Sequence, residues 1–116
     1  MQAQRLDWLA DSSVEAIAAQ HGTFDLVLGA ALQFETWEAR LWSVLRAITH
    51  PGSIVALAHT TGAVFGAHAF SSDEEGAVVE ESGFHELKRI SGLSFGFHTR
   101  WAQDVSDFEI VLFRRS

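Results

Sequence analysis

Aromatic and acidic side chains gather between Phe34 and Glu38, and this segment is the part of the sequence best suited to bind a positively charged group. Phe34 and Trp37 offer aromatic faces to a cation, and Glu35 adds a carboxylate beside them. Such a set would orient an amine and stabilise charge that develops on it. The alternative is that Glu35 and Glu38 open a helix, where carboxylates meet the positive end of the helix dipole. The pattern favours this second interpretation.

Metal and nucleophile chemistry find little support in the sequence. The six histidines show no i,i+4 or His-x-His pair, and no nearby Asp or Glu completes a ligand spacing. They are His21, His50, His59, His68, His85 and His98. No serine lies in a nucleophile-elbow sequence, and the absence of cysteine removes thiol catalysis, disulfides and Cys-based zinc sites. We therefore expect no metal centre.

Length and charge limit the function classes. The chain has 116 residues, one domain or part of one, and its 47% hydrophobic content is enough to bury a core. Acidic residues number 15 against 8 basic ones, and the formal net charge of -7 disfavours binding to nucleic acid or an anionic membrane. No apolar run is long enough to span a membrane, and the first residues lack the apolar core of a signal peptide. A cytoplasmic protein is the expectation.

Helix signals occur three times. Ser12 and Glu15, at capping-box spacing, predict a helix over 13–20. The next helix carries apolar residues at the spacing of one buried face. These residues are Trp37, Leu41, Val44, Leu45 and Ile48. A third helix is expected over 72–82, although the interior Gly76 weakens it.

Strand signals alternate with these helices. Segments 24–32 and 53–60 are apolar throughout, as strands buried on both faces of a parallel sheet are. Two further strands are expected over 84–90 and 107–114, with a long loop or hairpin tip between them. The order helix, strand, helix, strand, helix, strand, strand predicts an α/β fold that ends in an antiparallel hairpin.

This order predicts an uncovered sheet face. Right-handed crossovers that step along a sheet in one direction place every connecting helix on the same side. Alternate residues of two wholly apolar strands would then face water on the other side, which forgoes about 25 cal/mol for each Å² of apolar surface left unburied. We infer from the sequence that another segment, another chain or a second copy completes the domain.

Several segments resemble the C-terminal half of class I, seven-strand S-adenosylmethionine (SAM)-dependent methyltransferases. They are Leu6-Asp7-Trp8, the short helix after it, the strand FDLVLGAALQF and the strand HPGSIVALAH. The similarity is closest to the protein-lysine methyltransferase branch, which carries an LDW-type element, a (F/Y)DLILG(A/S)D-x-x-Y element and a closing antiparallel strand pair. The resemblance covers essentially all of this chain but only about half of the family's domain. It implies a Rossmann-like methyltransferase fold, SAM as cofactor and a protein lysine side chain as substrate.

The resemblance also implies cofactor-binding residues. Trp8 matches the tryptophan that lines the adenine end of the cofactor, Asp7 stands beside it, and Ala30 matches a small residue whose backbone approaches the cofactor. A flat aromatic gives stacking area and a missing side chain gives room. The alternatives are that Trp8 anchors the core and that Ala30 serves close packing.

Two departures from the family bear on activity. The D-x-x-Y element falls on Ala31, Leu32, Gln33 and Phe34, so its carboxylate and its phenol are absent. The Gly-rich loop and the acidic residue that hold the rest of the cofactor should precede Asp7, and this sequence contains neither. The glycines of segment 60–68 follow the wrong strand and lack the G-x-G spacing. We expect the isolated chain to be inactive, and its catalytic residue is unknown.

Three functions therefore stay open. The first is a SAM-dependent methyltransferase present as one incomplete domain over 1–116, with Phe34, Glu35 and Trp37 on the substrate side. The second is a non-catalytic methyltransferase-like subunit or interaction module, completed by a partner chain or by self-association. The third is an unrelated α/β binding module that shares only the fold. None of the three calls for nucleic acid or a membrane as partner.

Overall fold

The computed structural model describes residues 3–30, 38–60, 73–94 and 107–116. Over these residues the chain forms three helices and four strands, in the predicted order. They are α1 (Asp11–His21), β1 (Phe24–Ala30), α2 (Glu38–Ile48), β2 (Thr49–Thr60), α3 (Asp73–Glu81), β3 (Phe84–Ser94) and β4 (Asp107–Arg115). No helix within these ranges has the length and apolar character needed to cross a membrane.

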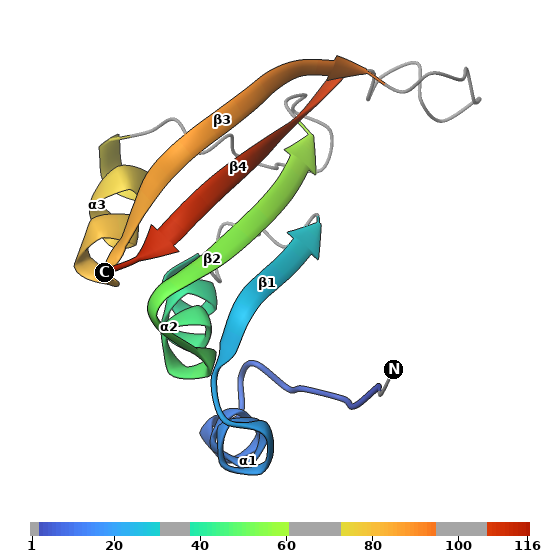
Figure 1. Ribbon diagram of the computed structural model, residues 1–116, viewed down its shortest axis with the longest axis vertical. Coiled ribbons are helices and arrows are strands. Elements are labelled where there is room, and N and C mark those ends of the chain that lie inside the picture. The colour runs from blue at the N-terminus through green and yellow to red at the C-terminus, as the bar shows by residue number, and fades with distance from the viewer. Residues whose placement is uncertain (1–2, 31–37, 61–72, 95–106) are drawn as a thin grey trace.

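The strands form one mixed sheet in the order β1-β2-β4-β3 (Figure 1). β1 and β2 are parallel, whereas β4 is antiparallel to both of its neighbours, β2 and β3. The last strand of the chain is thus inserted between β2 and β3. The predicted antiparallel hairpin is confirmed, and its second strand also joins it to the parallel pair.

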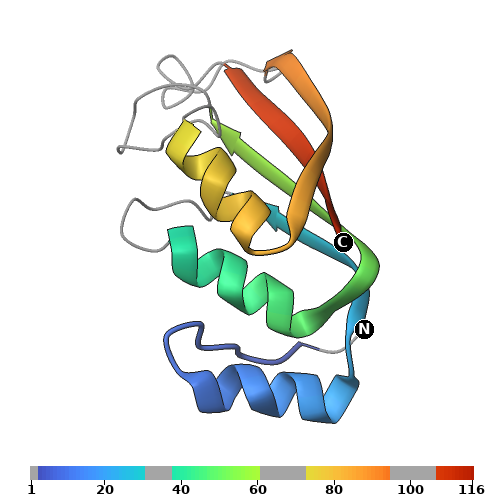
Figure 2. The same cartoon turned by 90° about the vertical axis from the view of Figure 1, so that its left-hand side faces the viewer.

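The helices lie on one side of the sheet, as the crossover rule predicts (Figure 2). The core between the two layers contains α2 residues Leu41, Trp42, Val44, Leu45 and Ile48 and sheet residues Val55, Leu57, Phe84, Val111 and Phe113, all less than a tenth exposed. The ring of Trp42 lies 4.8 Å from that of Phe113, in an edge-to-face arrangement, and 5.3 Å from that of Phe84. These aromatic contacts fix α2 against the middle of the sheet.

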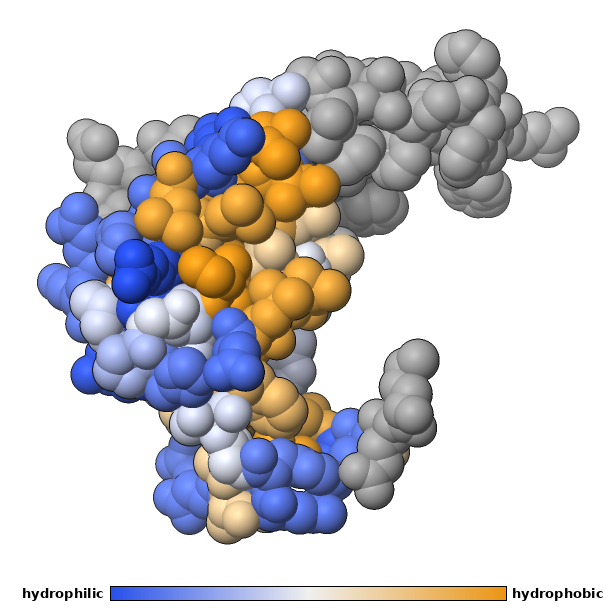
Figure 3. All heavy atoms as spheres, in the orientation of Figure 1, coloured by the Kyte–Doolittle hydropathy of each residue, from blue (hydrophilic) through white to orange (hydrophobic). Residues whose placement is uncertain are grey.

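The other face of the sheet is open over the described residues, as the order of elements predicts, whereas the expectation that segment 24–32 is buried on both faces is wrong. The strand over 24–32 is not buried on both faces, because the side chains of Leu26 and Leu28 are 56% and 73% exposed. The cause is the position of β1, which ends the described sheet and carries no helix on this side. Figure 3 shows this face as a broad hydrophobic area over the strands.

Helix boundaries also differ in detail from the prediction. α1 begins at Asp11, and its N-cap residue, Ala10, makes no side-chain hydrogen bond, so Ser12 and Glu15 do not form the expected capping box. α1 ends at His21, and the predicted stop, Gly22, follows it as the C-cap with a φ of 71° and donates its N–H to the carbonyl oxygen of Ala18. A positive φ at this position suits glycine, which has no Cβ to clash.

Candidate functional site

The turn that contains Asp7 and Trp8 is held by contacts from two helices. The backbone N–H of Asp7 donates to Ser13 Oγ of α1 over 3.0 Å, and Asp7 Oδ1 accepts from the N–H of Leu9 over 3.0 Å. Arg40 of α2 donates from Nε to the carbonyl oxygen of Trp8 over 2.5 Å and forms an ion pair with Asp11 at 2.6 Å. The turn is therefore fixed by the amino-terminal ends of α1 and α2.

Asp7 and Trp8 also line a hollow in the surface. Its volume is about 220 Å³, and its wall is formed by residues Arg5, Leu6, Asp7, Trp8 and Leu9. Trp8 is half-buried and packs against the hydrophobic core, so it anchors the turn as well as lining the hollow. The packing supports the interpretation that Trp8 anchors the core, and its role in lining the cofactor stays a prediction. The indole of Trp8 offers a flat aromatic face beside this hollow.

Ala30 lies at the same end of the sheet as this turn. It ends β1 as described, and in the register of the parallel pair it stands beside Ala58 of β2. α1 and α2 run antiparallel to the strands, so their amino-terminal ends and the carboxyl ends of β1 and β2 lie on one side of the molecule (Figure 2). In open α/β sheets ligands bind at this end, and two alanines leave the backbone accessible there.

The predicted substrate-side residues lie outside the described part of the chain. Phe34, Glu35 and Trp37 belong to segment 31–37, as do the positions that depart from the D-x-x-Y element, and the glycines expected to form a loop after Thr60 fall in segment 61–72. Of the predicted cofactor residues, Asp7 and Trp8 lie together beside the hollow, whereas Ala30 lies at the same end of the sheet but is not among the residues that line it.

The fold has counterparts among solved methyltransferase structures. N-methyltransferase NodS from Bradyrhizobium japonicum WM9 matches 95% of this chain over 71% of its own length, with 13% identity and a TM-score of 0.56. NodS in complex with S-adenosyl-L-homocysteine (SAH) matches 80% of this chain over 46% of its own, with 17% identity and a TM-score of 0.53. The M1.HpyAVI-SAM complex matches 98% of this chain over 55% of its own, with 15% identity and a TM-score of 0.52.

The chain has a Rossmann-like methyltransferase fold. Identities this low establish the fold alone, and the chain spans only about half the length of the SAH and SAM complexes that it matches. No protein-family model and no curated protein sequence matches it. The predicted fold class is therefore confirmed from structure, while the lysine-specific branch stays a prediction.

A buried carboxylate, Glu109, lies at the same end of this methyltransferase fold, and its partners could not be identified from the sequence. Glu109 of β4 is only 5% exposed and stands opposite His59, near the carboxyl end of β2. Arg89 Nη1 of β3 donates to Glu109 Oε1 over 2.5 Å, and Ser91 Oγ donates to Oε2 over 3.2 Å. Arg89 also pairs with Glu86 at 2.6 Å. Because Glu109 shares a strand face with core residues, the alternation of β4 already implied a buried charge that needs a cation.

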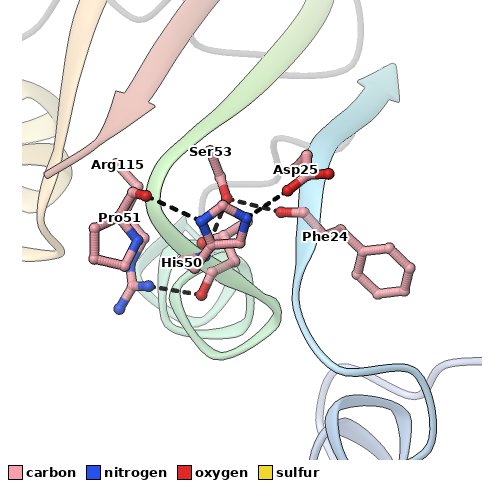
Figure 4. Close-up of polar contacts among 7 residues, drawn as sticks. Phe24, Asp25, His50, Pro51, Ser53 and Arg115 are labelled. Carbon is pink, nitrogen blue, oxygen red and sulfur yellow. Dashed lines mark hydrogen bonds and ion pairs between the residues drawn. The ribbon is translucent and has the colours of Figure 1, made fainter.

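A cluster at the opposite end of the sheet contains Asp25, His50 and Ser53 but is not a catalytic triad (Figure 4). His50 Nε2 contacts Asp25 Oδ1 at 2.6 Å, and its Nδ1 contacts the carbonyl oxygen of Pro51 at 3.0 Å. Ser53 Oγ accepts from the backbone N–H of His50 and donates to the carbonyl oxygen of Phe24 over 2.7 Å. The imidazole therefore does not reach the serine hydroxyl, and no nucleophile is activated.

The surroundings of His50 favour its charged form. Both ring nitrogens face oxygen acceptors, which are satisfied together only when both nitrogens carry protons. The hydrogen bond to the Pro51 carbonyl and the one to the Asp25 carboxylate raise the pKa of His50 above its ordinary value of 6.5. His50 thus joins the amino-terminal ends of β1 and β2, beside a register shift between Phe24 and Leu26.

No metal site is found within the described ranges, where no group of three or more His, Cys, Asp or Glu residues is arranged to hold an ion. His21 contacts Gln4 Oε1 through Nε2 at 3.0 Å, and His85 is exposed on β3. The remaining histidine side chains, His59, His68 and His98, lie outside the described residues.

Proposed function

We propose that this chain is the C-terminal part of a SAM-dependent methyltransferase and that Asp7 and Trp8 hold the adenine end of the cofactor. One observation carries the proposal: β4 is inserted antiparallel between β2 and β3, in a fold matched by methyltransferases solved with SAM and SAH. The hollow beside Asp7 and Trp8, at the carboxyl end of the sheet, supports it.

The described residues would act by binding and positioning. The indole of Trp8 offers stacking area to adenine, and the carboxylate of Asp7 retains lone pairs for a further donor after it accepts from the N–H of Leu9. Ala30 and Ala58 leave room for the cofactor to approach the strand ends. SAM itself supplies the methyl group as a sulfonium, so the protein mainly aligns the acceptor with it.

The acceptor that we propose is a protein lysine side chain. Its support is the sequence resemblance to the protein-lysine methyltransferase branch, together with Phe34, Glu35 and Trp37, which would face an amine from the aromatic and acidic segment after β1.

A non-catalytic methyltransferase-like subunit is the second candidate. The observation in its favour is the replacement of the family's carboxylate and phenol by Ala31 and Phe34, which removes orienting and electrostatic help from the acceptor amine. Such a subunit would retain the fold and its contacts without transferring a methyl group.

Calorimetric titration with SAH tests the cofactor proposal. In the full gene product that carries this chain, we expect Trp8→Ala to weaken SAH binding roughly 5- to 150-fold, the range of base stacking on an aromatic. Trp8→Phe, which keeps an aromatic ring, should retain most of the affinity for SAH. An unchanged melting temperature of the Trp8→Phe variant would show that the substitution leaves the fold intact. Failure of the unsubstituted gene product to bind SAH would refute the proposal, whereas SAH binding without transfer to lysine peptides would favour the second candidate.

A further inference from the structure

The carboxylate of Glu109 lies just beyond the core, on the side of the sheet that the helices cover. The register pairs Gly29 of β1 with Leu57 of β2, and Leu57 with Val111 of β4. Leu57 and Val111 are at most 2% exposed, so this row of residues faces the helices. Two residues further toward the carboxyl end of β2, the same side of β4 carries Glu109, opposite His59. The fold therefore places a carboxylate where the core ends and the ligand-binding end of the sheet begins.

The alternation of β1 assigns the family's missing carboxylate to the same side of the sheet. In the family resemblance that carboxylate falls on Ala31, which lies outside the described residues. In the sequence, position 31 continues the alternation of Val27 and Gly29, whose side of β1 faces the core. β1 and β4 flank β2, so these two strands lie two strand spacings apart, roughly 10 Å. A group bound between their ends can be met by a carboxylate from either strand.

Contacts from β3 orient the carboxylate of Glu109. Arg89 Nη1 donates to Oε1 over 2.5 Å, and Ser91 Oγ donates to Oε2 over 3.2 Å. Ser91 lies within a register shift of the β3–β4 pair, between Ile90 and Leu93. Irregularities of this kind are frequent next to active sites, where they re-aim a side chain. An ionised carboxylate offers about four lone-pair sites, more than these two contacts use.

Stability alone does not account for a charge at this position. Val111 and Phe113 occupy the same side of β4, and both are apolar and buried. Taking a carboxylate out of water costs free energy, and replacing a buried ion pair by apolar residues is often neutral or stabilising. An apolar residue at position 109 would therefore serve the core as well as Glu109 does. The buried carboxylate instead suits a role toward a charged ligand.

We propose that Glu109 is the carboxylate that binds the acceptor amine, in place of the one that the family carries at the position of Ala31. This inference rests on the proposed function. Methyl transfer forms a bond from the lone pair of a neutral amine to carbon and breaks the S–C bond of SAM, whose electron pair stays on sulfur. The positive charge moves to the nitrogen, which then loses a proton to solvent. A carboxylate beside the nitrogen accepts its N–H, directs the lone pair toward the methyl group and stabilises the developing charge.

The order of the strands agrees with this division of roles. The segment that contains Asp7 and Trp8 lies on the β1 side of the sheet, whereas β4 lies beyond β2 (Figure 1). A cofactor whose adenine stacks on Trp8 and that passes Ala30 would direct its other end toward β4. Glu109 then stands on the acceptor side of the reacting centre.

Methyl transfer and cofactor binding, measured on the full gene product that carries this chain, test the role of Glu109. With methyl-labelled SAM and lysine peptides, Glu109→Gln should lower kcat about 100-fold, as the loss of one preorganised electrostatic contact does, and leave the SAH affinity in calorimetry unchanged. Glu80→Gln removes the same charge from an exposed residue of α3 and should leave both quantities unchanged. Equal kcat values for the Glu109→Gln and unsubstituted proteins would overturn the inference.

Restoring the family's carboxylate separates an acceptor-binding role from a structural one. Ala31→Asp, introduced into the Glu109→Gln protein, should recover most of the lost kcat, which it cannot do if Glu109 only supports the fold. Absence of recovery would assign Glu109 a structural role and refute the inference. If Glu109→Gln also loses SAH affinity, Arg89→Leu/Glu109→Leu replaces the ion pair by apolar residues and should keep the fold. Full kcat in that double variant would equally refute the inference.

The unsubstituted gene product distinguishes this inference from the proposed function. If it does not bind SAH, the cofactor proposal is wrong and the inference is wrong with it. If it binds SAH but methylates no lysine peptide, the cofactor proposal stands and the role of Glu109 toward an amine is refuted.

Discussion

At the level of single residues, the two ends of the sheet carry different chemistry. At the carboxyl end, the side chains of Arg40 and Ser13 hold the turn that contains Asp7 and Trp8 through hydrogen bonds to its backbone of 2.5 and 3.0 Å. At the amino end, His50 uses both ring nitrogens to join strands and does not contact the hydroxyl of Ser53. Residue types alone would have allowed a triad here, and only the direction of the hydrogen bonds excludes it.

The titration of His50 is the first prediction at this scale. Its raised folded-state pKa means that its contribution to stability is complete below about 6.5 and is lost as the pH rises through the folded-state pKa. NMR titration of the imidazole should give a pKa above the ordinary value. Asp25→Asn should lower that pKa but leave it raised, because the larger cause, the hydrogen bond to the Pro51 carbonyl, remains. A His50 pKa at or below 6.5 in the unsubstituted protein would contradict the geometry in Figure 4.

At the level of elements, the ends of helices decide how the layers join. α2 ends at Ile48 and passes directly into β2 at Thr49, whose hydroxyl donates to the carbonyl oxygen of Leu45 over 2.6 Å. α3 ends before Gly83, which has a φ of 84° and lies against Arg46 of α2. Arg46 Nη1 in turn donates to the carbonyl oxygen of Ser82 over 2.9 Å. The junction after α3 thus also connects two helices.

Substitution of Gly83 tests this junction. Gly83→Ala forces a side chain into left-handed backbone, at a cost of about 1–2 kcal/mol in the free energy of unfolding, and its Cβ would overlap Nη1 of Arg46. Gly22→Ala is the comparison for backbone strain alone, because Gly22 also has a positive φ but no atom within 4 Å of the added Cβ. In denaturant unfolding, an Arg46→Ala background should reduce the loss caused by Gly83→Ala and leave the loss caused by Gly22→Ala unchanged. An undiminished loss for Gly83→Ala in that background would show that Arg46 is not the cause.

At the level of the whole molecule, the sheet has one covered and one open face. Val55 and Leu57 of β2 are at most 2% exposed beneath the helices, whereas Leu26 and Leu28 of β1 face outward on the other side. A contiguous apolar area exposed on one face of a sheet is typical of an interaction site. The described part of the chain therefore retains a core while exposing apolar side chains on the other face of the sheet.

A lysine introduced on the open face of the sheet should affect stability much less than a lysine introduced on the covered face. Leu26→Lys/Leu28→Lys should change the free energy of unfolding of the isolated chain by no more than about 0.5 kcal/mol, because both side chains are exposed. It should also reduce aggregation and the binding of a hydrophobic dye. Val55→Lys, which buries a charge in the core, should lower stability by several kcal/mol. A large loss of stability in the β1 variant, measured by thermal and denaturant unfolding, would mean that another part of the chain covers this face.

Local pattern and connectivity were enough to predict much of this protein. Periodicity gave the order of elements, and the handedness of crossovers gave the single layer of helices, since both depend on backbone geometry and side-chain spacing. Gly22 and Gly83 marked helix ends because few other residues adopt a positive φ. The LDW-type element located the turn of Asp7 and Trp8, which the structure places beside a hollow at the carboxyl end of the sheet.

Only the tertiary structure decided that β1 ends the described sheet and which charges are paired. The sequence of β1 reads as a strand buried on both faces, but burial depends on the neighbours in the sheet, and β1 has only one in the described fold. The partners of Glu109 come from β3, and those of His50 from β1 and from the residue after it in β2, so their meeting depends on strand order and register. Sequence spacing carries no information on such long-range contacts, because pairing across a sheet is set by the packing of the whole chain.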